Sequence, residues 1–115
     1  MHELSIITSL FETLESQARD HGAARITAVE LKVGPLSGVV PELLQDAFDM
    51  FKQGTVADGA ALTIVQPPVR VLCRSCGAET EPQGLIFKCG ECGSTDISLA
   101  AGTDLYLEKV ELETD

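Results

Sequence analysis

Apolar residues recur every three or four positions from the start of the chain, which is the spacing of one face of an amphipathic helix. This first stripe consists of Leu4, Ile7, Phe11, Leu14 and Ala18. Gly22 follows it and can adopt the left-handed conformation that often ends a helix. His21 stands directly before that glycine, where a cationic ring suits a helix C-terminus. We therefore expect His21 to have this local role and not to bind metal.

The periodicity changes to two in the segment RITAVELKVG, which predicts a half-buried strand. Its inner face is expected to carry Thr27, Val29, Leu31 and Val33. Glu30 and Lys32 lie on its outer face. The segment GPLSG, residues 34–38, is typical of a turn. A second strand is predicted over Ala61–Gln66, where two prolines stop it.

A second amphipathic helix is predicted between these two strands. Pro41 suits the first turn of a helix, and Glu42 beside it interacts favourably with the positive end of the helix. The apolar stripe of this helix consists of Leu44, Ala47, Phe48 and Phe51. Gly54 is expected to end it. A helix that connects two strands of one sheet predicts a parallel, right-handed crossover.

The segment DLYLEKVELE predicts a third strand, and its alternation slips between Leu107 and Val110, which indicates a bulge or an edge position. A cysteine-containing segment separates the second and third strands, and its ends must return close together. We therefore expect these two strands to pair antiparallel. The predicted fold is α+β, a small three-stranded mixed sheet with two helices on one face and an inserted zinc-ribbon module. The predicted domains are residues 1–69 with 100–115, and residues 70–99.

Four cysteines form two CxxC pairs, Cys73 with Cys76 and Cys89 with Cys92. A two-residue gap lets two thiolates turn toward one cation, and two such pairs complete a tetrahedron. A glycine follows each second cysteine and lets the backbone bend around the sulfurs. We favour a structural zinc site; two disulfides, a redox CxxC and a rubredoxin-type iron site are the alternatives. The segment lacks the apolar residues for a core of its own, so metal would have to hold it together.

Charge and composition limit the classes of partner that the protein can bind. Of the 115 residues, 18 are acidic and 8 are basic, which gives a formal net charge of −10. This balance argues against nucleic acid, whose phosphates need a basic surface, and against an anionic membrane surface. The apolar share of 44% suits a globular protein. Neither an apolar run of membrane-spanning length nor a secretory signal is recognisable, so we expect a cytoplasmic protein with reduced thiols.

The chain opens with MHELS, which places a metal-binding side chain, His2, beside the first turn of a predicted helix. The α-amine, the backbone nitrogen and the imidazole of residue 2 could close around one cation, with the amide nitrogen of Glu3 completing a plane. Nitrogen donors in a plane suit Ni(II) or Cu(II). On chemistry alone, the commoner interpretation is an exposed histidine without a metal role, followed by a glutamate that stabilises the first turn.

The MHELSI opening, the segment KVGPLSGVVPE and the paired CxxC motifs follow one another in an order that spans essentially the whole chain. Together they resemble the HypA family, the nickel metallochaperones of NiFe-hydrogenase maturation. The resemblance implies that His2 and the terminal backbone nitrogens bind nickel, with Glu3 as a further candidate, and that the four cysteines hold structural zinc. It also implies a GTPase partner, HypB, delivery to the hydrogenase large subunit and, in some relatives, a contribution to urease. The implied fold, a mixed α/β nickel domain plus a zinc domain, agrees with the predicted element order.

Two other classes of function compete with this interpretation. A zinc-ribbon protein-interaction module with no nickel role would need only the cysteines. Nucleic acid is not its expected partner, because acidic residues outnumber Arg74 and Lys88 in the cysteine segment. An enzyme would need a nucleophile with a paired base, an open metal position or a phosphate-binding loop, and none of these is recognisable. We therefore expect a protein that is not an enzyme.

Overall fold

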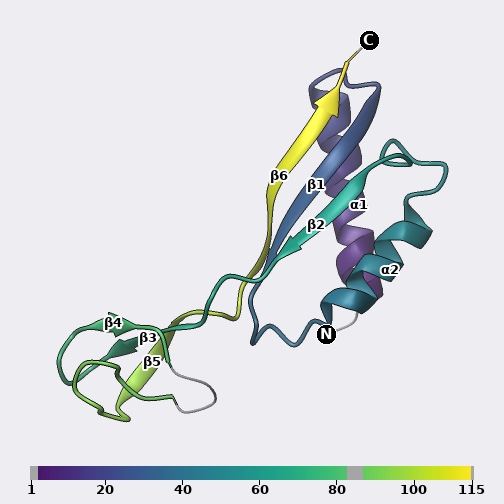
Figure 1. The fold of residues 1–115 in the computed structure, drawn as a ribbon. Coiled ribbons are helices and arrows are strands. Elements are labelled where there is room, and N and C mark those ends of the chain that lie inside the picture. The colour runs from purple at the N-terminus through teal and green to yellow at the C-terminus, as the bar shows by residue number, and fades with distance from the viewer. Residues whose placement is uncertain (1–2, 83–86, 115) are drawn as a thin grey trace.

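The computed structural model describes residues 3–82 and 87–114, which form two separate three-stranded sheets (Figure 1). The first sheet and its helices comprise α1 (Glu3–Asp20), β1 (Arg25–Val33), α2 (Pro41–Phe51), β2 (Ala61–Val65) and β6 (Leu105–Glu113). The second sheet comprises β3 (Arg70–Cys73), β4 (Glu79–Thr80) and β5 (Ile97–Ala101). The molecule measures 55 × 25 × 17 Å along its principal axes, with the second sheet at one end (Figure 1). The predicted α+β class, with two helices and a small mixed sheet, is confirmed.

Both helices lie on the same face of the first sheet, whose strand order is β2-β1-β6 (Figure 1). The last four residues of the predicted α1 stripe are buried, but Leu4 is 58% exposed. Leu10 is buried in addition, because α1 contacts β1 and β6 as well as α2. A helix that packs on two neighbours needs a wider apolar face than a single stripe. The prediction for this helix is therefore wrong at Leu4 and right along the rest of the stripe.

The C-terminal end of α1 follows its sequence signal. Gly22 has a φ of 62°, and the N–H of Ala23 donates to the carbonyl oxygen of Ala18 at 2.9 Å, a bond typical of a left-handed helix end. The Nδ1 atom of His21 lies 2.9 Å from the carbonyl oxygen of Gln17. His21 thus contacts a carbonyl of the last turn, in agreement with its expected local role.

Strand β1 is the centre of the sheet, and its inner face differs from the prediction at one position. Three of the four predicted inner residues are buried, but Ile26 is buried in place of Thr27. Ile26 pairs with Leu112 of β6, and Ala28 pairs with Glu111, the neighbour of Leu112. Thr27 is therefore an extra residue on β1. A bulge of this kind changes the phase of alternation, which explains why the predicted face fails at Thr27.

Strand β6 pairs antiparallel with β1, on the side away from β2, so the expected pairing of the second and third strands is wrong. The strands β1 and β6 each have nine residues, whereas β2 has five, and β1 therefore offers the longer ladder. The slip predicted between Leu107 and Val110 is confirmed. Consecutive residues of β1 pair with Lys109 and Leu107, which leaves Glu108 as a bulge on an edge strand. Strands β1 and β2 are parallel, as the crossover predicts.

Helix α2 begins at Pro41, as predicted, and buries Leu44 and Phe48 completely. The Phe48 ring lies 5.3 Å from the Phe11 ring, centroid to centroid, at a tilted angle that suits aromatic pairs. This contact joins the two helices over the sheet. Phe51 lies at its edge and is 41% exposed, so the last residue of the predicted stripe contributes less than expected.

The turn after β1 contacts the linker that leads from β5 to β6. The N–H of Gly34 donates to the carbonyl oxygen of Asp104, and the N–H of Leu36 donates to that of Gly102, both at 2.7 Å. A Cβ atom on Gly34 would overlap the carbonyl oxygen of Gly102, so this close approach requires glycine. The turn predicted at residues 34–38 therefore fixes the linker where it leaves the second sheet.

The second sheet, with strand order β4-β3-β5 and antiparallel pairing, is not predicted by the sequence pattern. In the described residues, the main cluster of buried apolar side chains includes none from β3, β4 or β5. Val71, Cys73 and Cys89 are buried apart from it. This agrees with the expectation that the cysteine segment has little core of its own. Strand β5 ends at Ala101, beyond the boundary expected at residue 99, and the domain division itself stays a prediction.

Candidate metal centre

Two turns bring the four cysteines together at the second sheet. Cys73 is the last residue of β3, and Cys76 lies in the turn that follows it. Cys89 and Cys92 belong to a second turn, and the four Sγ atoms all lie within 4.8 Å of one another. Within residues 3–82 and 87–114, this is the one place where three or more histidine, cysteine or acidic side chains meet closely enough to hold a metal ion.

The two turns share one backbone design, and we call them knuckle 1 (residues 73–78) and knuckle 2 (residues 89–94). In each, the N–H of the first cysteine donates at 2.9 Å to the carbonyl oxygen five residues later. The N–H of the glycine four residues after that cysteine donates at 3.0 Å to the cysteine's own carbonyl oxygen. These glycines, Gly77 and Gly93, have φ values of 79° and 75°, which favour glycine. The expected role of a glycine after each CxxC pair is confirmed.

Backbone N–H groups point at the two buried sulfurs. Cys73 Sγ accepts the N–H of Cys76 at 3.4 Å, and Cys89 Sγ accepts the N–H groups of Glu91 and Cys92 at 3.3 and 3.4 Å. Such donors stabilise a thiolate. The N–H of Cys76 is the largest cause that lowers the pKa of Cys73 to about 6, and the N–H of Cys92 is the largest cause that lowers the pKa of Cys89.

The two exposed thiols shift the other way. The backbone N–H of Ala78 favours the Cys76 thiolate, but the neighbouring Cys89 sulfur, partial desolvation and the remaining sulfurs together raise the pKa of Cys76 to about 12. The pKa of Cys92 is also raised, because its neighbours outweigh the N–H of Ser94. Four crowded sulfurs cannot all be ionised without a cation. A dication at their centre would stabilise all four as thiolates.

The sulfur positions fit a tetrahedral metal–thiolate site. The Sγ atoms of Cys73 and Cys92 are 3.6 Å apart, and so are those of Cys76 and Cys89. A tetrahedron with metal–sulfur bonds of about 2.3 Å has sulfur–sulfur edges of about 3.8 Å. A disulfide would need a sulfur–sulfur distance of about 2.0 Å, and all four thiols are free. Four thiolates close the shell of the ion, which suits a structural site and leaves no position for a substrate.

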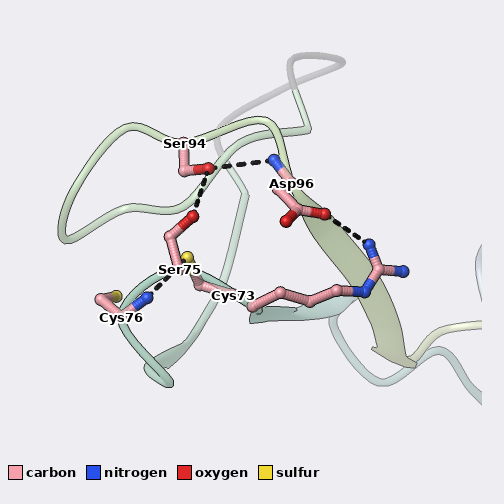
Figure 2. Close-up of polar contacts among 6 residues, drawn as sticks. Cys73, Ser75, Cys76, Ser94 and Asp96 are labelled. Atoms are coloured by element: carbon pink, nitrogen blue, oxygen red, sulfur yellow. Dashed lines mark hydrogen bonds and ion pairs between the residues drawn. The ribbon is translucent and has the colours of Figure 1, made fainter.

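Polar contacts beside the sulfur cluster join the two knuckles (Figure 2). Nη1 of Arg74 donates to Oδ1 of Asp96 at 2.7 Å, and Oγ of Ser75 lies 3.1 Å from Oγ of Ser94. Sequence reasoning did not identify these four residues as partners. The available signal is that an arginine stands inside the first CxxC pair and an aspartate stands shortly after the second.

The expected nickel ligand His2 lies outside the described residues, so its metal role stays a prediction. Glu3 is the first residue of α1, and its Oε2 accepts the N–H of Val40 at 3.4 Å. Val40 is the N-cap residue of α2. The carboxylate therefore lies near the N-terminal ends of both helices, where the helix dipoles favour negative charge.

Comparison with known proteins identifies the family. The chain matches the family model described as "Hydrogenase/urease nickel incorporation, metallochaperone, hypA" over residues 1–112. It is 42% identical over 115 residues to the hydrogenase maturation factor HypA of Aquifex aeolicus, with 100% of both chains covered. It is 42% identical over 113 residues to the protein of the same name from Desulfitobacterium hafniense, with 98% and 99% covered. The chain belongs to the HypA family.

Solved HypA structures have the same fold. A solution structure of the Ni metallochaperone HypA from Helicobacter pylori matches with a TM-score of 0.72 and 28% identity, over 100% of both chains. A second HypA solution structure matches with a TM-score of 0.79 and 28% identity, over 100% of this chain and 98% of that one. The resemblance inferred from the MHELSI opening and the CxxC pairs is confirmed for the family. Neither helix in residues 3–82 and 87–114 has the length and apolar character needed to cross a membrane.

Proposed function

We propose that this HypA-family chain binds Ni(II) at its N-terminus and delivers it during NiFe-hydrogenase maturation, while its four cysteines hold a structural zinc ion. The observation that carries this proposal is the family match over residues 1–112, which includes the MHE opening and both CxxC pairs. The proposed partners are the GTPase HypB and the hydrogenase large subunit, with urease maturation as a further destination. The proposed location is the cytoplasm, and the chain itself is not expected to be an enzyme.

The proposed nickel ligands are the His2 imidazole, the α-amine and the first backbone nitrogens. Helix α1 begins at Glu3, and the first N–H groups of a helix have no intrahelical acceptor. They can lose a proton to a metal without breaking a helical hydrogen bond. The positive end of the helix opposes a cation, and the Glu3 carboxylate offsets that effect. Oε2 of Glu3 accepts the N–H of Val40 at 3.4 Å, and a carboxylate has a second oxygen that could bind a metal directly.

The two proposed sites differ in their ligands, and each ligand set favours a different metal. Nitrogen donors in a plane suit Ni(II), whereas tetrahedral thiolates suit zinc. A carrier must also release its metal. A small ligand set drawn from one end of the chain suits transfer to a destination that offers more ligands. The closed four-cysteine shell suits the opposite task, which is to hold an ion permanently.

The nickel site is tested by comparing three proteins. These are the native chain, a His2→Ala variant and a chain with a short tag before Met1. The substitution removes the imidazole and keeps the amine, whereas the tag keeps the imidazole and converts the amine into an amide. Both changes should sharply weaken nickel binding, measured by calorimetry with zinc already bound. Zinc content and far-UV circular dichroism should stay unchanged, because neither change reaches the buried stripe of α1.

Each other result has a distinct meaning. Full nickel affinity in the tagged chain would remove the amine from the site and leave a role for His2. Full affinity in both altered chains would contradict the N-terminal site altogether and would favour a zinc-ribbon interaction module. Metal analysis of the untagged protein decides between zinc and iron at the cysteines.

A further inference from the structure

The two knuckles are also connected by side chains that are not candidate metal ligands. Arg74 and Ser75 come from knuckle 1, and Ser94 comes from knuckle 2. Asp96 lies between knuckle 2 and β5, directly before the first residue of that strand (Figure 2). We call these four residues the knuckle clasp. The polypeptide chain between residues 78 and 89 connects the knuckles covalently, and the clasp adds a non-covalent link between the two halves of the sulfur shell.

Ser94 occupies the centre of the clasp. Its carbonyl oxygen accepts the N–H of Cys89 at 2.9 Å, which closes knuckle 2. Its Oγ accepts the N–H of Asp96 at 3.0 Å, which fixes the turn out of knuckle 2. The same Oγ lies 3.1 Å from Oγ of Ser75 in knuckle 1. One hydroxyl therefore links the exit of the second knuckle to the turn of the first.

Arg74 and Asp96 make the second connection through both backbone and side chain. The N–H of Arg74 donates to the carbonyl oxygen of Asp96 at 2.9 Å, one residue beyond the last β3–β5 pair, Cys73 with Ile97. The guanidinium donates to the Asp96 carboxylate at 2.7 Å. A charge-assisted bond backed by a backbone bond between the same residues holds a more defined geometry than an isolated surface ion pair.

We infer that the knuckle clasp controls how quickly the four-cysteine site releases its metal. This inference rests on the proposed zinc site. Cys73 and Cys89 are buried, but Cys76 and Cys92 are exposed, so a competing chelator reaches the shell from the side of the exposed sulfurs. For release, sulfurs of the two knuckles must move apart. The clasp opposes that separation without contacting the ion, and Ser94 and Asp96 act as positioning residues.

The same sheet offers a matched control. Arg70 Nε donates to Glu79 Oε2 at 3.3 Å, and Arg70 Nη2 donates to the Glu79 carbonyl oxygen at 3.2 Å. This pair has the same chemistry as Arg74 with Asp96 and a similar exposure. It joins β3 to β4, however, and does not link the knuckles. A Glu79→Gln variant therefore removes a comparable ion pair from the same sheet.

The test compares zinc-loaded native protein with Ser94→Ala, Ser94→Thr, Asp96→Asn and Glu79→Gln variants. Zinc content is measured first, and release is then followed by absorbance after mixing with an excess of the chelator 4-(2-pyridylazo)resorcinol. We expect Ser94→Ala and Asp96→Asn to release zinc about three- to tenfold faster, a range between the effects of surface ion pairs and of residues that orient metal ligands. Ser94→Thr keeps the hydroxyl and should release zinc at nearly the native rate, as should Glu79→Gln.

The absorption spectrum of Co(II)-substituted protein shows whether the four-cysteine site of each variant is still correctly folded. All variants should keep the native Co(II) absorption of a tetrahedral four-thiolate site, because no ligand is altered. Native release rates in both Ser94→Ala and Asp96→Asn would overturn the inference, as would equal acceleration by Glu79→Gln or a changed Co(II) spectrum in the clasp variants. Native protein without zinc would instead contradict the proposed zinc site.

Discussion

The helical layer, which comprises α1 and α2 with β1, β2 and β6, and the module, which comprises the two knuckles with β3, β4 and β5, are ordered by different forces. In the first, fifteen of the described residues, all apolar, form one continuous buried cluster drawn from both helices, β1, β2 and the connections between them, and side chains of β6 pack against it. In the second, the buried apolar and cysteine side chains among residues 70–82 and 87–101 are Val71, Cys73 and Cys89, and these segments are otherwise ordered by turns, short strands and polar contacts. The first part can be stable through burial of apolar surface, whereas we expect the second to need a bound ion to hold its turns together.

This difference assigns a physical role to each part of the sequence. Apolar periodicity determines the helical layer, which tolerates the exchange of one apolar side chain for another of similar volume but not the loss of that volume. The module depends on four side chains that converge on one point, so the loss of one ligand affects the whole unit. The following predictions test this contrast, beginning with the largest expected effect.

Loss of metal should unfold the module and leave the helical layer folded. We expect a Cys89→Ser variant, or native protein treated with a strong chelator, to lose amide-exchange protection between Val71 and Leu99. Most of the far-UV helical signal should remain, because both helices pack on the first sheet. Hydrogen exchange with mass spectrometry and circular dichroism on the same samples measure both parts. Loss of all helical signal would show that the two parts form a single cooperative unit.

Zinc binding should release nearly four protons per ion at pH 7. In an unfolded module the thiols keep ordinary pKa values of about 8.5 and are almost fully protonated at this pH. In preformed knuckles the pKa of Cys73 is lowered to about 6 and the pKa of Cys89 is lowered as well, so one or two thiols are already ionised. Zinc would then displace only about two or three protons. Zinc affinity therefore weakens as pH falls in either case, but more steeply near pH 7 if the module folds on the metal.

Calorimetry in buffers of different ionisation enthalpy counts these protons. A count between two and three would show that the knuckles exist before zinc arrives. That result would weaken the contrast between the two parts of the molecule, because the module would then have order of its own.

A core substitution should produce the opposite pattern. Phe48 is fully buried, and its ring lies 5.3 Å from that of Phe11. We expect Phe48→Ala to lower the free energy of unfolding of the helical layer by about 3–5 kcal/mol, through lost burial and the cavity left behind. Zinc content should be unchanged. Denaturant titration followed by circular dichroism measures the first effect, and loss of zinc from the variant under native conditions would contradict the separation of the two parts.

The parts that the sequence predicts well are those in which local pattern and packing agree. The burial of Leu14 and Phe48 follows from helical spacing, and the bulge in β6 follows from the slip after Leu107. The knuckle turns follow from the CxxC spacing and its glycines. In each case a few adjacent residues contain the whole signal.

The parts that the sequence does not predict depend on contacts between distant residues. The choice of β1 as the partner of β6 depends on the relative lengths of β1 and β2. The bulge at Thr27 depends on a register that involves the other end of the chain. The contact of Ser75 with Ser94 exists because two turns meet across the sulfur cluster. None of these features leaves a periodic trace in the residues that form it.

The connection between the two parts should be sensitive to one added methyl group. A Cβ on Gly34 would overlap the carbonyl oxygen of Gly102, which also accepts the N–H of Leu36. We expect Gly34→Ala to lower the free energy of unfolding by about 1–3 kcal/mol, because the linker has to move. Gly59→Ala is the matched control, since a Cβ there meets no atom within 4 Å, and it should change stability by no more than about 0.5 kcal/mol. Equal effects of the two substitutions would show that the close approach at Gly34 is unimportant.

The smallest effect is expected at Leu4, which fits the spacing of the helical stripe but is 58% exposed. Leu4→Ala should lower the free energy of unfolding by less than about 1 kcal/mol, because little apolar surface is lost and alanine is a better helix former. Leu14→Ala, at a position with no exposed surface, should cost about 2–5 kcal/mol in the same helix. Thermal and denaturant unfolding of the two variants measures the difference. Equal costs would mean that Leu4 is covered in solution, and sedimentation at several concentrations would show whether a second copy of the chain covers it.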